Sequence, residues 1–191
     1  MRINELKNRS DKELIERLLA GHESALNELM SRYKHKLYAF ISRYVKDEDA
    51  AYDILQESFI RLNFKAESYN SKYKFSTWLY QIAINLCRDW GRKQKLRHFL
   101  SLDKYIGDGN VNYHDILTDS TDNIEDLAST RQQLQIINEQ IEKLPHKLKT
   151  ALILFAIEGN SQEQCAEILG VSRKTIETRI YRARKILFEK I

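Results

Sequence analysis

The chain has 191 residues, enough for one domain or two small ones. It contains one proline and six glycines, and no β-branched run alternates with polar residues over the length of a strand, so composition favours an all-helical fold. The formal net charge is a modest +4. The two cysteines, Cys87 and Cys165, lack the spacing of metal ligands, and we see no secretory signal and no membrane-length apolar run. We therefore expect buried thiols, a cytoplasmic location, and no disulfide, metal or cofactor.

Charge is distributed unevenly along the chain. Residues 72–97 carry seven basic side chains and one acidic one, whereas residues 101–128 carry seven acidic side chains and one basic one. Residues 146–191 carry nine basic side chains and five acidic ones. This pattern predicts two helical domains, 1–97 and 129–191, joined by a flexible acidic linker over 98–128.

Three helices are predicted at the start of the chain. Ser10 and Glu13 form a capping box, which begins a helix that ends near Gly21. Apolar residues then recur every three or four positions from Leu26 to Tyr44, which indicates a longer second helix. The acidic residues at 47–49 suit the positive end of a third helix, which contains AAYDILQESFIRL.

Within this third helix, Asp53, Gln56 and Glu57 share one face. Such an acidic and polar patch beside a helical core can dock a basic partner surface. The alternative is that the patch is only solvated.

A fourth helix, FSTWLYQIAINLCRDWGRKQK, has a core stripe from Leu79 to Trp90. The opposite side carries amide and basic groups, namely Gln81, Asn85, Arg88, Arg92 and Lys95. The loop before it contains Tyr69, Lys72, Tyr73 and Lys74. Rings stack on unpaired bases and lysines neutralise phosphate, so the loop and helix together fit single-stranded nucleic acid. The alternative, that the aromatic residues simply close the bundle, fits Phe75 and Trp78 better than Tyr69 and Tyr73.

The acidic segment 98–128 lacks helical periodicity and contains turn signals such as GDGN. We interpret it as a mobile tether between independently packed domains, kept extended by self-repulsion. The alternative is a solvated linker with no further task.

A helix-turn-helix is predicted from Ser161 to Leu187. Ser161 and Gln164 form a capping box, Gly170 ends the first helix, and Ser172 caps the second. In the second helix an apolar stripe leaves a basic, hydrogen-bonding face free, with Lys174, Thr178, Tyr181, Arg182 and Lys185. This is typical of a recognition helix in the DNA major groove, and the alternative is a helical hairpin with a solvated basic face.

No catalytic constellation is found: there is no carboxylate pair, activated nucleophile, phosphate-binding glycine loop or metal cluster. We expect a protein that is not an enzyme and has no small-molecule substrate. Two other interpretations are a stand-alone dimeric helix-turn-helix regulator and a DNA-cleaving enzyme that uses Tyr181. The second lacks the arginines and histidines that such chemistry needs around the tyrosine.

The motifs together resemble the extracytoplasmic-function sigma factors, a two-domain group of the sigma-70 superfamily of RNA polymerase initiation factors. AAYDILQESFIRL is similar to the polymerase-binding helix of region two, and KFSTWLYQIAINLCRDWGRKQK to its promoter-melting helix, which reads the −10 element. LPHKLKTALILFAIEGNSQEQCAEILGVSRKTIETRIYRARKIL is similar to region four, which reads the −35 element.

The resemblance implies a role for each surface. Asp53, Gln56 and Glu57 would contact the clamp helices of the largest polymerase subunit, and region four would contact the flap of the second largest. The opened −10 strand would be held by Tyr69, Lys72, Tyr73, Lys74, Gln81, Asn85, Arg88 and Arg92. The −35 duplex would be met by Ser172, Arg173, Lys174, Thr175, Thr178, Arg179, Tyr181, Arg182 and Lys185. The resemblance also implies an anti-sigma partner, often a membrane protein.

Overall fold

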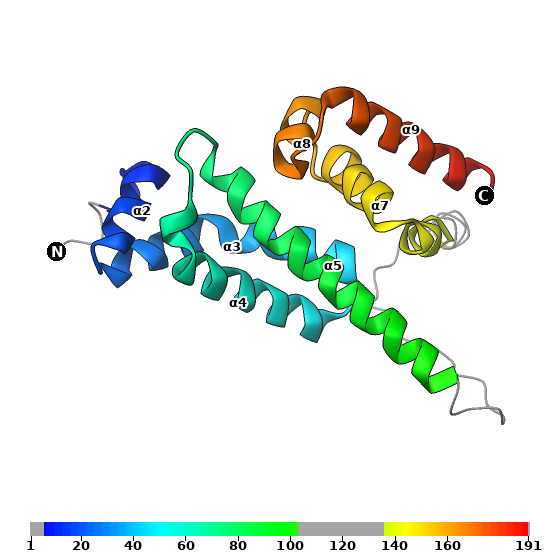
Figure 1. Ribbon diagram of the computed structural model, residues 1–191, viewed down its shortest axis with the longest axis horizontal. Helices are drawn as coiled ribbons and strands as arrows, with labels where there is room; N and C mark the ends of the chain where they lie inside the picture. Colours follow the sequence, from blue (N-terminus) through cyan, green and yellow to red (C-terminus); the bar gives the residue numbers. More distant parts are fainter. Residues whose placement is uncertain (1–5, 103–135, 191) are drawn as a thin grey trace, which may run out of the picture.

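The computed structural model describes residues 6–102 and 136–190, and all the regular structure in these ranges is helical (Figure 1). The first group of helices is α2 (Asp11–Leu19), α3 (Glu23–Val45), α4 (Glu48–Phe64), the 3-10 turn η1 (Ala66–Ser68) and α5 (Phe75–Leu102). The second group is a helical stretch over 136–143, then α7 (His146–Leu152), the π-helical segment η2 (Ile153–Ile157), α8 (Gln162–Leu169) and α9 (Arg173–Phe188). The all-helical prediction is confirmed, and the acidic segment predicted as a tether lies almost entirely outside the described residues.

The helix starts follow the predicted caps. Ser10 and Glu13 form both bonds of a capping box before α2. Asp47 caps α4 by accepting a hydrogen bond of 2.9 Å from the Ala50 backbone N–H, and two further acids occupy the first turn. These contacts satisfy backbone N–H groups that have no partner within the helix.

Helices α2 to α5 form a bundle around a continuous apolar core. Leu14, Leu29, Phe40, Leu62 and Leu79 are all fully buried there. In Figure 1, α5 crosses the bundle and extends beyond it. The helix ends at Leu102, five residues past the predicted end of the first domain.

The helix-turn-helix prediction is confirmed in detail. Ser161 donates its backbone N–H to Gln164 Oε1 at 2.8 Å and accepts from the Gln164 N–H, which completes the capping box of α8. Gly170 follows α8 in the left-handed conformation, with φ of 61°. Ser172 then caps α9 by accepting from the Thr175 N–H. Ile176, Ile180 and Ala183 are the buried stripe of α9.

We expect Gly170→Ala to lower the stability of the protein by about 1 kcal/mol, because a Cβ atom is strained at positive φ even though no neighbouring atom crowds it. The matched control is Gly91→Ala within α5, where the glycine has helical geometry and open space around it. That change should raise stability, since alanine has the higher helix propensity. Thermal melts of both variants check the prediction, and a stable Gly170→Ala protein would contradict it.

The expectation that the two groups of helices pack independently is wrong. Helix α8 packs on α5, η2 packs on α3, and one apolar cluster contains Phe40 and Cys87 together with Ile153 and Ile168. The physical reason lies in α5, which buries Ile84 and Cys87 in addition to the predicted stripe. A helix with apolar residues on more than one side must pack against a second element to bury them, and here α8 is that element.

Among the described residues, no helix has the length and apolar character required to cross a membrane.

Candidate polymerase and nucleic-acid interfaces

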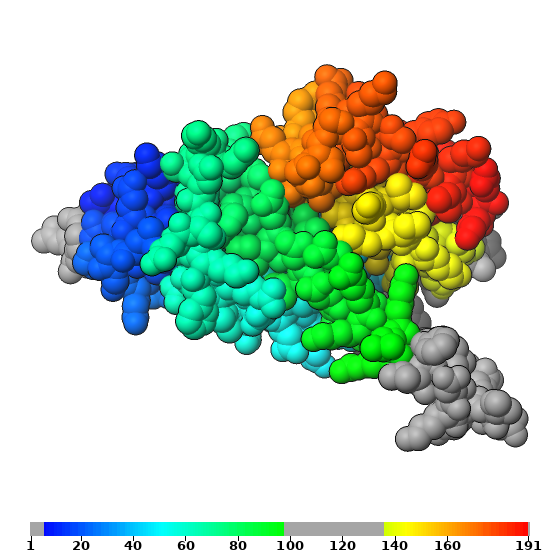
Figure 2. All heavy atoms as spheres, viewed as in Figure 1, coloured from blue at the N-terminus to red at the C-terminus, as the bar shows by residue number. Residues whose placement is uncertain are grey.

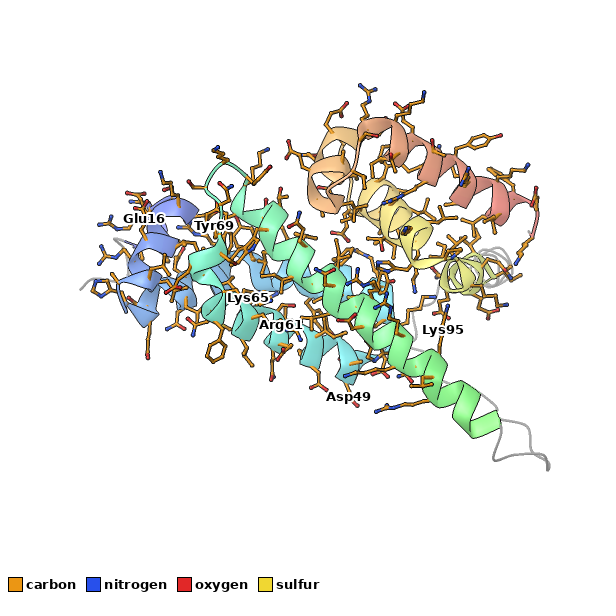
Figure 3. The ribbon with its side chains drawn as sticks, in the orientation of Figure 1. Glu16, Asp49, Arg61, Lys65, Tyr69 and Lys95 are labelled. Carbon is orange, nitrogen blue, oxygen red and sulfur yellow. The ribbon has the colours of Figure 1, made fainter. Side chains whose placement is uncertain are left out.

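The predicted acidic patch lies on the outer side of α4. Asp53 and Gln56 are exposed, while Glu57 is half-buried and accepts a hydrogen bond of 2.7 Å from Arg61 Nε. Tyr52 is half exposed and its ring lies 4.7 Å from that of Tyr38. The patch therefore presents one free carboxylate and one free amide beside an aromatic ring. Figure 3 labels Asp49 and Arg61 near the two ends of this surface.

Sequence reasoning missed the apolar continuation of this surface. Ile60 and Phe64 follow Gln56 by one and two helical turns, and their side chains are 49% and 82% exposed. The signal was available, because the i, i+4, i+8 spacing places all three on one side of a helix. An exposed phenylalanine next to polar residues is typical of a protein interface.

The loop before α5 contains one aromatic residue held by the fold and one that is free. Tyr69, labelled in Figure 3, donates its hydroxyl to the Tyr73 carbonyl at 2.8 Å, and its ring packs against Phe75 and Trp78 at 5.9 and 5.4 Å. Burial raises the pKa of Tyr69. Tyr73 is 60% exposed, and the flanking Lys72 and Lys74 are exposed as well. Tyr69 therefore packs against the bundle, a role that we expected for Phe75 and Trp78 rather than for Tyr69.

The polar side of α5 borders a cleft of about 1780 Å³ between the two groups of helices. Helix α8 packs on α5, and Figure 2 shows the two helices in contact. Asn85 is exposed in the cleft, Gln81 is half-buried, and Arg88 and Arg92 both reach Asp89, at 3.7 and 3.8 Å. The other cations that line the cleft are Lys46, Lys95, Arg97, Lys147, Lys149 and Arg179, and they outnumber the acidic residues of the lining, which are Asp47, Glu48, Glu139 and Glu142. The cleft therefore concentrates positive charge from both domains.

His146 lies at the inner wall of this cleft. Its Nδ1 is hydrogen-bonded to the Tyr44 hydroxyl of α3. Burial, together with positive charge on Arg88 and Arg92 of α5, Lys149 of α7 and Arg179 of α9, lowers the pKa of His146 to about 4. The ring is neutral at pH 7.

This lowered pKa makes stability depend on pH. A histidine with a lowered folded pKa contributes stability that is complete above its unfolded pKa near 6.5 and is lost as the pH falls toward 4. We expect acidification from pH 7 to pH 5 to lower the melting temperature of the wild type by about 2–4 °C more than that of His146→Gln. The glutamine keeps an acceptor for Tyr44 and cannot titrate. Equal losses in thermal melts of the two proteins would contradict the prediction.

Helix α9 presents the basic face that was predicted. Lys174, Thr178, Tyr181, Arg182 and Lys185 are all exposed, with Tyr181 at 68%. Thr178 donates its hydroxyl to the Lys174 carbonyl at 2.9 Å. These residues form one surface that no other described element covers.

The remaining predicted −35 residues are held by the fold to different degrees. Ser172 and Thr175 form the cap of α9, with their hydroxyl oxygens 2.9 Å apart. Arg173 makes ion pairs of 2.9 and 3.2 Å with Glu163 and Glu177. Arg179 is half-buried and faces the cleft as well as a smaller hollow beside Lys147. The structure therefore brings the exposed set together on one face, and it gives Ser172, Thr175 and Arg173 local partners.

Over residues 6–102 and 136–190, no three His, Cys, Asp or Glu side chains gather as a metal site. Cys87 and Cys165 are buried free thiols, as predicted.

The described residues thus combine a helical bundle that carries an exposed acid and amide pair with a capped helix-turn-helix that has a basic outer face. The family model for Sigma-70 region 2 matches residues 29–97, and that for Sigma-70, region 4 matches residues 134–187. The chain is 36% identical to the ECF RNA polymerase sigma-E factor of Haemophilus influenzae over 186 residues, which is 95% of each chain. It is 34% identical to the ECF RNA polymerase sigma factor SigW of Bacillus subtilis, over 92% of this chain and 94% of the relative.

Solved structures share the fold. The complex of CnrH with the cytosolic domain of CnrY matches with a TM-score of 0.64 and 23% identity over 95% of this chain and 96% of that one. The sigma factor RpoE of Bartonella quintana, solved with the anti-sigma factor NepR, matches with a TM-score of 0.59 and 25% identity over 85% and 94%. The chain belongs to the extracytoplasmic-function sigma factors of the sigma-70 superfamily. It is an alternative sigma factor, a transcription initiation factor and not an enzyme.

Proposed function

We propose that this protein binds core RNA polymerase through α4 and directs it to promoters whose −10 and −35 elements it reads with α5 and α9. The observation that carries the proposal is the pairing of two free surfaces in one chain. One is the exposed Asp53 and Gln56 of α4, and the other is the exposed basic face of α9. They occur in the order of region 2 and region 4.

Each surface receives the role that its chemistry suits. Asp53, Gln56 and Glu57 dock the clamp helices of the largest subunit, and the second domain docks the flap of the second largest. The opened strand is held by the loop before α5 and by the polar side of α5. The free ring of Tyr73 can stack on a base, while Lys72 and Lys74 neutralise phosphate. The exposed face of α9 enters the major groove.

Dividing the work between two domains explains the specificity. A single module of this size buries about 600–1,000 Å² on DNA, which is too little to select a promoter tightly. Two modules held on the polymerase act at high effective concentration. We propose domain boundaries at residues 97 and 129, with the polymerase supplying the chemistry.

We also propose that the protein is cytoplasmic and is regulated by an anti-sigma factor, which can be anchored in the membrane. The support is that RpoE, its neighbour of similar fold, was solved with an anti-sigma factor. A partner that covers the surfaces of α4 and α5 would keep the protein from polymerase and DNA.

The test is run-off transcription with purified core polymerase and genomic fragments, with and without the protein. New discrete start sites that depend on the protein are the expected result, and they define the promoter sequences. Footprints made by the protein alone, with no new transcripts, would instead identify a stand-alone regulator.

A further inference from the structure

The loop before α5 is closed by hydrogen bonds of its own. The Lys72 N–H donates to Asn70 Oδ1 at 3.0 Å, and the Tyr73 N–H donates to the Asn70 carbonyl at 3.1 Å. The Tyr69 hydroxyl donates to the Tyr73 carbonyl at 2.8 Å, which ties the end of the loop to its start. The backbone that carries the exposed Tyr73 ring is therefore ordered by the loop itself.

Tyr69 also joins this loop to the helical bundle. Its ring lies 5.9 Å from that of Phe75 and 5.4 Å from that of Trp78, between ring centroids. Phe75 is 3% exposed and belongs to the core of the bundle. One side chain thus packs its ring on the bundle and bonds its hydroxyl to the loop, so the position of the loop depends on that of the ring cluster.

Helices α2 and α3 contact the same ring cluster. Tyr33 of α3 packs edge-on against Phe75 at 5.1 Å, and its hydroxyl donates to Asp11 of α2. Burial and this hydrogen bond raise the pKa of Tyr33, so the hydroxyl remains a donor at neutral pH. Arg32 donates to Asp11 at 2.9 Å and to the Leu6 carbonyl at 3.0 Å, and α2 packs on η1. The first described residues of the chain are therefore connected to the start of the loop.

We propose that Tyr69 is a positioning residue for capture of the opened −10 strand, acting through the Tyr73 carbonyl, and that Asp11 and Tyr33 stabilise the ring cluster on which it depends. The inference rests on the proposed function for the role of the loop. It extends that role to α2, because Asp11 lies before residue 29, where the match to Sigma-70 region 2 begins. A preformed loop loses less conformational entropy on binding, so selectivity depends on side chains that do not touch the strand.

Two substitutions test the two parts of the proposal. Tyr69→Phe removes the hydroxyl and keeps the ring, and Tyr33→Leu removes a ring of the cluster. The matched controls are Tyr38→Phe and Tyr38→Leu, because Tyr38 is also on α3 but its ring packs against Tyr52 of α4. Circular dichroism checks that all four proteins are folded. Tyr69→Phe, which leaves the ring packing unchanged, decides the outcome if Tyr33→Leu unfolds.

The first readout needs no DNA. Trypsin cleaves after lysine, and Lys72 and Lys74 are exposed in the loop. The rate of cleavage at these two sites, mapped by mass spectrometry, reports how often the loop opens. We expect Tyr69→Phe and Tyr33→Leu to be cleaved there about fivefold faster than the wild type, as the loss of one hydrogen bond implies. The Tyr38 variants should be cleaved at the wild-type rate.

The second readout is the selectivity of the holoenzyme formed with core polymerase. Fluorescence anisotropy gives its affinity for two labelled single strands, one with a −10 element identified by the run-off assay and one with the same bases scrambled. Tyr69→Phe and Tyr33→Leu should lower the preference for the −10 strand about fivefold. Binding of the scrambled strand should not change, because the lysines that neutralise phosphate remain. The Tyr38 variants should keep the wild-type preference.

The outcomes separate positioning from other roles of Tyr69. Faster loop cleavage together with a reduced preference supports the proposal. An unchanged preference in Tyr69→Phe would overturn it, as would equal losses on both strands. A reduced preference with unchanged loop cleavage would mean that the hydroxyl contacts the strand directly, which also overturns positioning. Wild-type behaviour of a folded Tyr33→Leu protein would overturn the part assigned to α2 and α3.

Failure of the proposed function would appear in the wild type rather than in the variants. It would be seen as absence of new start sites in the run-off assay, or as equal binding of the two strands by the wild-type holoenzyme.

Discussion

Replacing both Asp53 and Gln56 with alanine is expected to abolish association with core RNA polymerase and to leave the fold intact. Both side chains are exposed on α4, so their removal breaks no core contact. Truncation of a hot-spot residue of an interface costs about 2 kcal/mol or more, so loss of two such residues lowers affinity by more than roughly 100-fold. A pull-down with purified core polymerase measures the result.

A matched control comes from α3, where Glu23 and Asn27 are exposed one turn apart. Glu23→Ala/Asn27→Ala removes the same acid and amide chemistry from a different surface and should bind polymerase as the wild type does. Full retention of binding by the α4 double variant would reject the assignment of this patch.

Arg182→Ala is expected to weaken promoter binding by roughly 1–3 kcal/mol if the guanidinium reads a base edge in the major groove. Arg182 is exposed on the outer face of α9, next to Tyr181 and one turn beyond Thr178, so the change leaves the buried stripe untouched. Electrophoretic mobility shifts of the polymerase holoenzyme on the native promoter and on one with a scrambled −35 element measure the effect.

The comparison variant is Lys185→Ala, which removes an exposed cation from the last turn of the same helix. A lysine that contacts phosphate should weaken binding to both promoters equally and reduce the salt dependence of binding. Equal losses on both promoters for Arg182→Ala would show that it too contacts only the backbone.

The local structure of both domains could be predicted because its determinants are close together in the chain. Ser161, Gly170 and Ser172 act on backbone groups within four residues of themselves, and the α9 stripe follows from helical periodicity alone. The same periodicity predicted the exposure of Asp53 and Gln56 on α4 and of the basic face of α9, but not that of Ile60 and Phe64. What those side chains bind is a further inference, which the experiments above test.

The packing between domains could not be predicted because it depends on groups that are far apart in the sequence. Lys149 meets a backbone carbonyl 105 residues earlier, and no local pattern marks a lysine that will be buried. Ile84 lies outside the predicted stripe of α5, and its cover is supplied by α8. Tyr69 sits among polar residues in the chain, yet its neighbours in space are Phe75 and Trp78.

The position of α5 between two packed surfaces restricts its tolerance of sequence change. One side closes the first bundle, a second side meets α8, and a third carries the polar and basic groups. A substitution at Leu79 creates a cavity in one domain, one at Ile84 loosens the contact between domains, and one at Asn85 alters a surface group. Saturation mutagenesis of the chain should therefore find α5 the helix with the fewest permissive positions.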